Sequence, residues 1–418
     1  MMEFAYTEKT KKLIVQLEDF MDKYIYPHAE QWDKEVNSGI YPVSFIDDLK
    51  QLARDEGLWN LFLPGLQADE PGTRLTNLEY APLAEIMGKV SWASEVFNCN
   101  APDTGNMELL HMFASEQQRE QWLRPLMDGK IRSAFAMTEP DVSSSDATNI
   151  QTMIIREGDN YVINGRKWFI TNAAHPLCEF FIVMGRTDPD AEPHRQQSMV
   201  IVPKNTPGVN ILRNITIINH HSPEGHCEIL FENVKVPVEN LLDEEGQGFA
   251  LAQARLGPGR IHHCMRSIGS AELALDLMIM RAQERKTFGK FLYEHGALEE
   301  WISLSRIEID QARLLVLNAA WMIDKLGTKA ARKEISMIKV AIPRMLTAVV
   351  DRAMQTFGAM GASPDTPLPD MWVNGRTLRY IDGPDEVHIR SISRQERRAK
   401  RSVNDIHRFL YDRNASLT

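Results

Sequence analysis

Hydrophobic positions change their spacing twice along this chain. In the first block, up to about residue 133, apolar residues recur every three or four positions, which predicts amphipathic helices. The clearest examples are Leu13, Ile14, Leu17 and Phe20, then Phe45, Leu49 and Leu52. Pro and Gly clusters separate these stretches. The pattern therefore predicts an N-terminal helical domain over residues 1–133.

The second block, residues 134–245, consists of short runs rich in β-branched and aromatic residues. The runs cover 161–163, 168–171, 180–184, 198–202, 209–212 and 228–231. Asp-Asn, Asn-Gly and Pro-Gly turn signals separate them. This pattern predicts a small β-barrel or sandwich.

Helical spacing returns in the third block, residues 246–418, and its stretches are long. One stripe predicts a helix from about Ala297 to Leu326; its apolar members are Leu298, Ile302, Ile309, Val316, Ala320 and Ile323. A second helix is predicted over 335–357, bent at Pro343. The expected fold is α+β but mostly α, ending in a four-helix bundle. The glycines of 358–361 follow a helix rather than a strand, which excludes a Rossmann cofactor domain.

Composition limits the function classes. The net charge of −10 argues against nucleic-acid binding, which needs a basic surface. The four cysteines are widely spaced, so neither a zinc site nor a disulfide framework is expected. No apolar run is long enough to insert into a membrane, and Ser416–Thr418 is not a peroxisomal signal. A cytoplasmic location is the resulting expectation.

The segment from Phe135 to Asn172 carries the most chemical information. It holds aromatic surface at Phe135, Trp168 and Phe169, and hydroxyls at Thr138, Ser144 and Thr171. Its two halves are expected to pair in a sheet, which suits a flat ring with a polar edge, such as a flavin. A polar loop followed by an ordinary hairpin strand is the alternative that the residues themselves leave open.

Four ordered motifs resemble the acyl-CoA dehydrogenase family. They are Thr138-Glu139-Pro140, Trp168-Phe169-Ile170-Thr171, the stretch Glu284–Gly289 and the stretch Gln355–Gly361. Residues 255–266 and 382–388 are most similar to the branch that contains family members ten and eleven. The resemblance implies a flavoprotein that forms the α,β double bond of acyl-CoA thioesters in fatty acid β-oxidation.

The resemblance also implies a set of site residues. FAD would be held by Phe135, Met137, Thr138, Ser144, Phe169, Thr171, Arg285, Thr287, Phe288, Gln355, Gly358, Ala359, Pro384 and Glu386. The acyl-CoA would meet Ser144, Arg260 and Gly383. In the family, the segments around Arg285 and Gln355 reach the FAD of a neighbouring subunit, so a homodimer or homotetramer is expected. No metal is expected, and the pairs His220-His221 and His262-His263 are assigned to packing or to the surface.

Asp382 is the candidate base that removes the α-proton, because it stands just before Gly383, where most relatives have a glutamate. Without the resemblance, the residues favour a turn role for Asp382, since Asp-Gly is a strong turn former. The family's alternative position for the base falls at Gly259, which cannot act. Burial of Asp382 under the substrate is expected to raise its pKa.

On this hypothesis, the β-hydrogen leaves as hydride to flavin N5, and the electrons pass to electron-transferring flavoprotein. Long-chain or 2-methyl-branched acyl groups, including ones hydroxylated at C4, are the expected substrates. Two alternatives are a flavin oxidase of the same fold, such as nitroalkane oxidase, and a non-catalytic acyl-CoA-binding protein.

Overall fold

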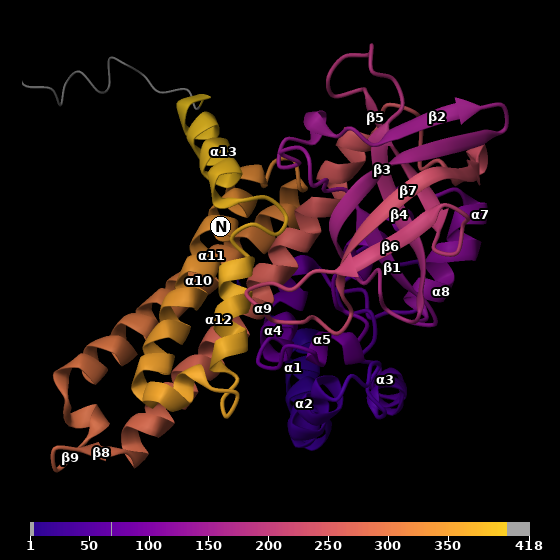
Figure 1. The fold of residues 1–418 in the computed structure, drawn as a ribbon. Helices are drawn as coiled ribbons and strands as arrows, with labels where there is room; N and C mark the ends of the chain where they lie inside the picture. Colours follow the sequence, from indigo (N-terminus) through magenta and orange to yellow (C-terminus); the bar gives the residue numbers. More distant parts are fainter. Residues whose placement is uncertain (1–3, 68, 399–418) are drawn as a thin grey trace, which may run out of the picture.

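Residues 4–67 and 69–398 are described by a computed structural model, in which helices and a single large sheet occupy successive parts of the chain (Figure 1). The stretch 399–418, with Ser416–Thr418, lies outside the described residues. Within the described part, no helix combines the length and the apolar character needed to cross a membrane.

The N-terminal part is helical, as the sequence predicts. Its helices are α1 (Glu8–Phe20), α2 (Ala29–Asn37), α3 (Ile46–Asp55), α4 (Asn77–Met87), α5 (Ala93–Val96), α6 (Asp103–Phe113), α7 (Glu116–Gln118) and α8 (Arg124–Met127). Side-chain caps mark the starts of α1, α4 and α7. Thr7 accepts a hydrogen bond from the Thr10 N–H at the start of α1, and Thr76 and Glu79 form a capping box at the start of α4.

The middle part is a seven-stranded sheet in the form of a half-barrel. Its strands are β1 (Arg132–Ala136), β2 (Met153–Glu157), β3 (Asn160–Thr171), β4 (Cys178–Arg186), β5 (Gln197–Pro203), β6 (Val209–Asn214) and β7 (His226–Pro237). The order is β1-β4-β2-β3-β7-β6, and β5 pairs with β4. All six predicted runs fall inside strands. One expected pairing is wrong: β1 pairs in parallel with β4 and not with β3.

The long apolar runs of β4 and β5 are buried on both faces. Successive side chains of a strand point to opposite faces. Phe180 and Ile182 of β4 therefore pack in the core shared with the helices, whereas Phe181 and Val183 pack in a second core inside the half-barrel. The sheet is thus joined to the helical parts by a continuous apolar core.

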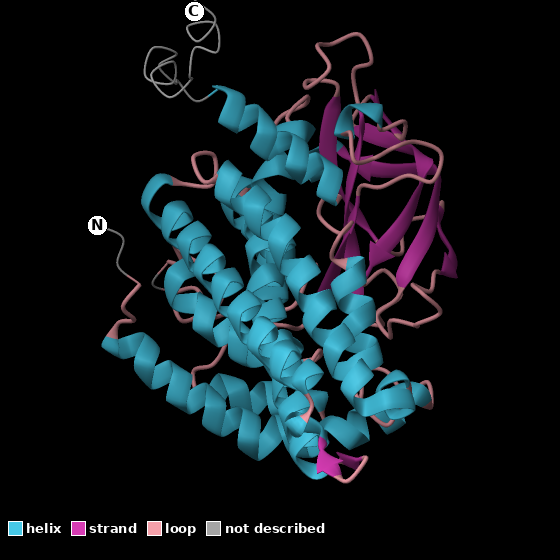
Figure 2. Cartoon of the chain, turned by 90° about the vertical axis from the view of Figure 1, so that its left-hand side faces the viewer, coloured by secondary structure: helices cyan, strands magenta, loops and turns pink. Residues whose placement is uncertain are grey.

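The C-terminal part is built on three long helices. Its elements are α9 (Gly248–Glu284), the hairpin strands β8 (Lys286–Thr287) and β9 (Lys290–Phe291), α10 (Gly296–Leu326), α11 (Arg332–Phe357), α12 (Leu368–Thr377) and α13 (Asp385–Arg398). Helix α11 contacts α9, α10, α12 and α13. Figure 2 shows the helices of the molecule grouped beside the sheet. Pro343 lies within α11, which remains a single helix.

Helices α4 and α9 approach each other closely because two glycines face the opposite backbone. A Cβ atom on Gly269 would lie 1.8 Å from the Glu85 carbonyl oxygen, and one on Gly88 would lie 2.0 Å from that of Arg266. Any larger residue would force the two helices apart. This contact fixes α9, and α9 carries much of the site described next.

Candidate active site

The loop between α12 and α13 places Asp382. Both Asp382 (φ 55°) and Gly383 (φ 104°) have positive φ values. Such a conformation is uncommon for a residue with a side chain and is concentrated at functional sites. Two cations hold the loop by its backbone. Lys339 Nζ donates to the carbonyls of Leu378 and Ile381, both at 2.7 Å, and Arg260 Nε donates to the Asp382 carbonyl at 2.9 Å.

The Asp382 carboxylate faces helix α9. Its Oδ2 lies 3.8 Å from His263 Nε2 and would lie 3.3 Å from a Cβ atom on Gly259. The two α9 residues are four positions apart and so share one face of the helix. Asp382 keeps only 14% of its side chain exposed. The missing side chain at Gly259 leaves the carboxylate room on the α9 side.

Opposing effects set the pKa of Asp382. Burial raises this pKa, but positive groups nearby lower it by more, so the net value lies below the ordinary 3.8. These groups are Lys339, Arg255 and Arg260, together with His263 where it is protonated. Burial and Arg266 lower the pKa of His263 to about 3, so at neutral pH the remaining three cations keep the carboxylate ionised. The predicted rise in this pKa concerns the carboxylate under bound substrate and stays a prediction; the number of cations that converge on the loop could not be inferred from the sequence.

The far end of the Asp382 loop is anchored where α13 begins. Asp385 is buried and accepts hydrogen bonds from Arg344 (3.0 Å) and from Arg379 (3.0 Å). Pro384 precedes it, and Glu386 in the first turn of α13 is exposed. The loop is thus fixed on both sides of Asp382.

Thr138 and Trp168 join the two halves of the 135–172 segment. Trp168 N–H donates to the Thr138 carbonyl (3.0 Å), and the Thr138 hydroxyl donates to the Trp168 carbonyl (2.6 Å). Since its proton is used in this way, the Thr138 hydroxyl can only accept a further hydrogen bond. Thr138 therefore joins the loop to β3, in place of the expected strand pairing.

A buried ion pair supports this junction. Lys167 Nζ lies 2.8 Å from Glu139 Oε1 and donates to the Met137 carbonyl, also at 2.8 Å. The Lys167 side chain is 0% exposed and that of Glu139 is 5% exposed. Glu139 also accepts hydrogen bonds from the backbone N–H groups of Gln151 and Thr152. The pair holds the backbone on both sides of Thr138.

Polar and aromatic groups lie at the end of β3. Phe169 sits in a bulge with φ 52°, and 42% of it is exposed. The Thr171 hydroxyl lies 2.9 Å from His226 Nδ1, and Ser144 Oγ accepts from the Glu139 N–H at 2.8 Å. An exposed aromatic ring in a strained conformation, next to hydroxyls, is a suitable surface for a flat ligand.

Arg255 of α9 connects the aromatic segment with the region of the base. Its guanidinium carbon lies 3.9 Å from the centre of the Phe135 ring, and its Nε donates to Asn106 Oδ1 of α6 at 2.8 Å. Burial lowers the pKa of Arg255 to about 10, which leaves it cationic at neutral pH. The N-terminal helices, the sheet and α9 therefore meet at this residue.

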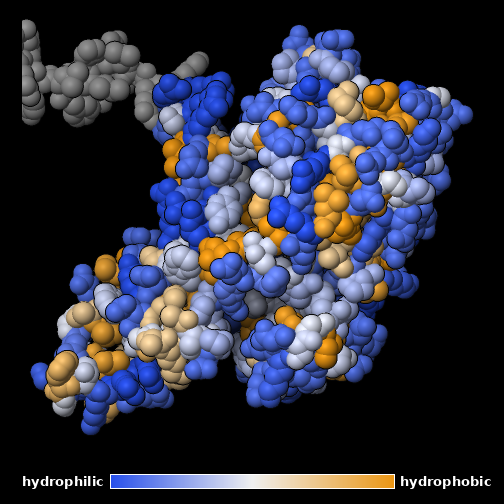
Figure 3. All heavy atoms as spheres, viewed as in Figure 1, coloured by the Kyte–Doolittle hydropathy of each residue, from blue (hydrophilic) through white to orange (hydrophobic). Residues whose placement is uncertain are grey.

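The remaining expected site residues lie elsewhere. Arg285 is exposed and Phe288, at the tip of the β8–β9 hairpin, is 95% exposed with φ 50°. Gly259 and Arg285 are 26 positions apart on and just beyond α9, roughly 40 Å at about 1.5 Å per residue. Figure 1 shows the hairpin at the end of the bundle away from the sheet, and Figure 3 shows hydrophobic side chains on the surface there.

Gln355, Gly358 and Ala359 lie at the same end as the hairpin. All three are exposed, and they follow Met354 at the C-terminal end of α11, where the guanidinium carbon of Arg281 lies 5.3 Å from the centre of the Phe357 ring. The expected cofactor residues thus form two groups, one near the sheet and the Asp382 loop and one at the distal end of the bundle. A single chain does not bring them together.

Sequence reasoning missed His263 and Lys339. His263 was assigned to packing or to the surface, and Lys339 was passed over, although a lysine inside an apolar helix face such as 335–357 was an available signal. Among the described residues, no group of His, Cys, Asp or Glu could hold a metal ion.

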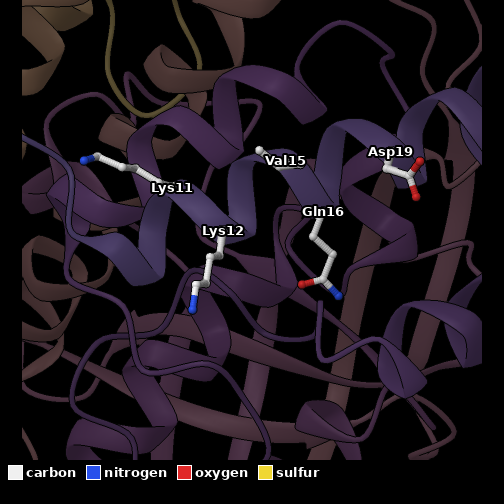
Figure 4. Close-up of a pocket in the computed structure, with 5 residues that line it drawn as sticks. All are labelled: Lys11, Lys12, Val15, Gln16 and Asp19. Atoms are coloured by element: carbon white, nitrogen blue, oxygen red, sulfur yellow. The ribbon is translucent and has the colours of Figure 1, made fainter.

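A surface hollow is unrelated to these residues. It lies along α1 and is lined by Lys11, Lys12, Val15, Gln16 and Asp19 (Figure 4). Figure 4 shows all five on one helix, and none belongs to the expected site. We therefore assign no function to this hollow.

Comparison with known proteins covers nearly the whole described chain. Residues 7–130 match the N-terminal domain of acyl-CoA dehydrogenases, 134–234 the middle domain and 246–396 the C-terminal domain. Probable acyl-CoA dehydrogenase FadE2 of Mycobacterium tuberculosis is 54% identical over 96% of this chain and 98% of its own length. Acyl-CoA dehydrogenase family member 11 of Gallus gallus is 48% identical over 94% of this chain, which spans only 51% of that protein.

Solved structures agree. A Mycobacterium abscessus protein, provisionally assigned as an acyl-CoA dehydrogenase, is 46% identical, covers 94% of this chain and 98% of its own, and superposes with a TM-score of 0.90. Butyryl-CoA dehydrogenase of Megasphaera elsdenii is 26% identical, covers 95% of this chain and 100% of its own, and has a TM-score of 0.80.

Proposed function

Because this chain belongs to the acyl-CoA dehydrogenase family, we propose that it oxidises an acyl-CoA thioester to the trans-2-enoyl-CoA, with Asp382 as the base that removes the α-proton. The observation that carries the proposal is the position of Asp382. Its carboxylate is ionised and faces Gly259, which has no side chain. Its loop is held by Arg260 and Lys339, which bind backbone carbonyls.

FAD is the cofactor that fits the residues near the sheet. Phe169 offers exposed ring surface, Ser144 and Thr171 offer hydroxyls, and the Thr138 oxygen can accept a hydrogen bond. When bound, FAD supplies the acceptor for the β-hydrogen, which leaves as hydride.

Asp382 must be ionised before substrate binds and more basic afterwards. The cations around it secure the first condition, since they lower its pKa. An apolar acyl chain that displaces water from the carboxylate would secure the second. The Asp382 N–H is a suitable donor to the thioester oxygen, where negative charge develops as the α-proton leaves.

A second copy of the chain would complete each site. Arg285, Phe288, Gln355, Gly358 and Ala359 are exposed at the distal end of the bundle, and Thr287 beside them is half-buried. An exposed phenylalanine and an arginine suit contact with the FAD of a neighbouring subunit. This supports a homodimer, or a homotetramer made of two dimers. Glu386 is also exposed and is assigned to the cofactor by family position only.

The proposed electron acceptor is electron-transferring flavoprotein, and the proposed substrates are long-chain or 2-methyl-branched acyl-CoAs. Arg260 and Gly383 flank Asp382 and are the proposed substrate contacts, together with Ser144. The cysteines Cys99, Cys178, Cys227 and Cys264 are all free and buried, in keeping with a reducing, cytoplasmic location.

An anaerobic titration of the purified protein with acyl-CoAs of increasing length and branching tests the reaction. Bleaching of the flavin absorbance by one class identifies the substrate, and Asp382→Asn should retain the flavin and slow its reduction by about 100-fold or more. Unchanged reduction in Asp382→Asn would exclude Asp382 as the base. Oxygen consumption with a nitroalkane, without reduction by any thioester, would instead establish the oxidase alternative.

A further inference from the structure

The two neighbouring histidines of α9 have different surroundings. His262 is buried, its ring lies against Tyr80 and Phe62, and neither ring nitrogen has a hydrogen-bond partner. His263 is 19% exposed, and its two nitrogens face Arg266 on one side and Asp382 on the other. Of these two histidines, His263 is therefore the one that lies between a cation and the proposed base.

The contact with Arg266 decides which nitrogen of His263 carries the proton. Arg266 Nη2 lies 3.2 Å from His263 Nδ1. A guanidinium can only donate hydrogen bonds, so Nδ1 must accept, and the proton of the neutral ring resides on Nε2. Nε2 is the atom that lies 3.8 Å from Asp382 Oδ2. The structure thus directs an N–H group toward the carboxylate.

We propose that His263 is a positioning residue for Asp382: its Nε2–H orients the carboxylate along α9, next to Gly259, and stabilises its ionised form. The inference rests on the proposed role of Asp382 as the base. The separation of 3.8 Å exceeds a hydrogen bond, and a shift of roughly 0.8 Å brings the two atoms to bonding distance. Contacts of this kind are often long before substrate binds.

Orientation matters here because aspartate is short. An aspartate reaches one methylene less far than a glutamate, so its two oxygens depend more on the rotation of one side chain. The loop anchors Lys339 and Arg260 bind backbone carbonyls and leave this rotation free. His263 Nε2, by contrast, lies 3.8 Å from the carboxylate oxygen Oδ2 itself.

Other charged and titratable groups also act on Asp382 and belong in any interpretation of pH dependence. They are Arg255 and Arg260 from α9, Lys339 from α11 and His388 from α13; Asp385 and the Cys264 thiol act on Lys339. Burial lowers the pKa of His388 to about 4, so it is neutral at neutral pH. Because burial also lowers the pKa of Lys339, each His263 variant is compared with the wild type at the same pH.

The test measures flavin reduction by acyl-CoA in stopped flow across pH for three variants. His263→Leu removes the donor, His263→Gln keeps an N–H at similar reach, and His262→Leu is the matched control on the same helix. We expect His263→Leu to slow reduction by about 10–100-fold without weakening acyl-CoA binding, because a misplacement of about 1 Å has such an effect. Its rate should rise with pH through a higher apparent pKa than in the wild type, since the ionised carboxylate loses a donor.

His263→Gln should restore most of the rate and pH profile, and His262→Leu should match the wild type. Flavin content and melting temperature show whether each variant is folded. An independent measurement needs no variant: ¹⁵N shifts of the histidine side chains should show His263 protonated at Nε2.

The inference is overturned if His263→Leu keeps the wild-type rate and pH profile, if His263→Gln is as slow as His263→Leu, or if the proton is found on Nδ1. Asp382→Asn, measured alongside, separates the two levels. If it reduces the flavin at the wild-type rate, the proposed base itself is wrong. If it is slow while His263→Leu is not, only the positioning role fails.

Discussion

Replacing Lys167 by methionine should weaken FAD binding, because Lys167 supports the proposed cofactor site without lining it. Methionine keeps the length and packing of the side chain but removes the charge that pairs with Glu139, so a carboxylate stays buried without its cation. Removing one partner of a buried pair costs about 3–5 kcal/mol. We expect about 3 kcal/mol here, because two backbone N–H groups still donate to Glu139 at 2.7 and 2.9 Å.

The lost stability should affect mainly the loop around Thr138, since Lys167 also donates a hydrogen bond to the Met137 carbonyl. If only half of the cost reaches the cofactor site, the FAD dissociation constant rises about tenfold. Apoprotein can be titrated with FAD by fluorescence, and holoprotein melting followed in parallel. Lys235→Met is the matched control: Lys235 lies in the same sheet, and its side chain is 63% exposed, 3.6 Å from Glu157.

The double variant Lys167→Met with Glu139→Gln removes the unpaired buried charge and should recover part of the lost stability and FAD affinity. The reasoning is refuted if Lys167→Met has an FAD dissociation constant within twofold of the wild type and the same melting temperature as the Lys235→Met control. It is also refuted if the double variant is no better than the single one.

Three further predictions concern other parts of the molecule. Burial raises the pKa of Glu108 well above its ordinary 4.5, so the folded chain holds a proton that the unfolded chain releases. The free energy of unfolding therefore falls as pH rises above 4.5, and the melting temperature of Glu108→Gln should match that of the wild type near pH 4.5 and exceed it at pH 8. Phe288→Ala should change the stability of the isolated chain by less than about 0.5 kcal/mol, since the ring is 95% exposed, but should weaken subunit association and FAD retention in sizing chromatography; unchanged association contradicts the proposed contact. Lys339→Met should cost about 2 kcal/mol through two lost charge-assisted hydrogen bonds and raise the apparent pKa of flavin reduction; a variant that melts and titrates like the wild type would exclude this anchoring.

Local patterns predicted the elements well, because they depend on neighbours in sequence. The apolar stripe placed a helix at about 297–326, and the structure has α10 at Gly296–Leu326. The six strand runs were found because alternation and turn residues mark them. The parallel pairing of β1 with β4 was missed, since a parallel partner lies across a crossover that leaves no short-range signal.

The same distinction between local and long-range information applies to the candidate site. Asp382 could be singled out from its motif, and its left-handed backbone agrees with the Asp-Gly turn signal. Its surroundings could not be inferred, because His263 and Lys339 lie 119 and 43 positions earlier in the chain. The cations that lower the pKa of Asp382 were missed for this reason: burial can be guessed from one segment, whereas convergent charges are a property of the whole fold.

The length of α9 has a consequence for mixed assemblies. One end of this helix faces the proposed base and the other leads into the hairpin with Arg285, so each chain would serve two different sites. Suppose that inactive Asp382→Asn chains and inactive Arg285→Met chains are co-expressed. In a dimer with one of each, both defects fall in the same site, and the other site is built entirely from intact residues. Two inactive proteins would then complement each other and regain up to half of the wild-type activity per dimer.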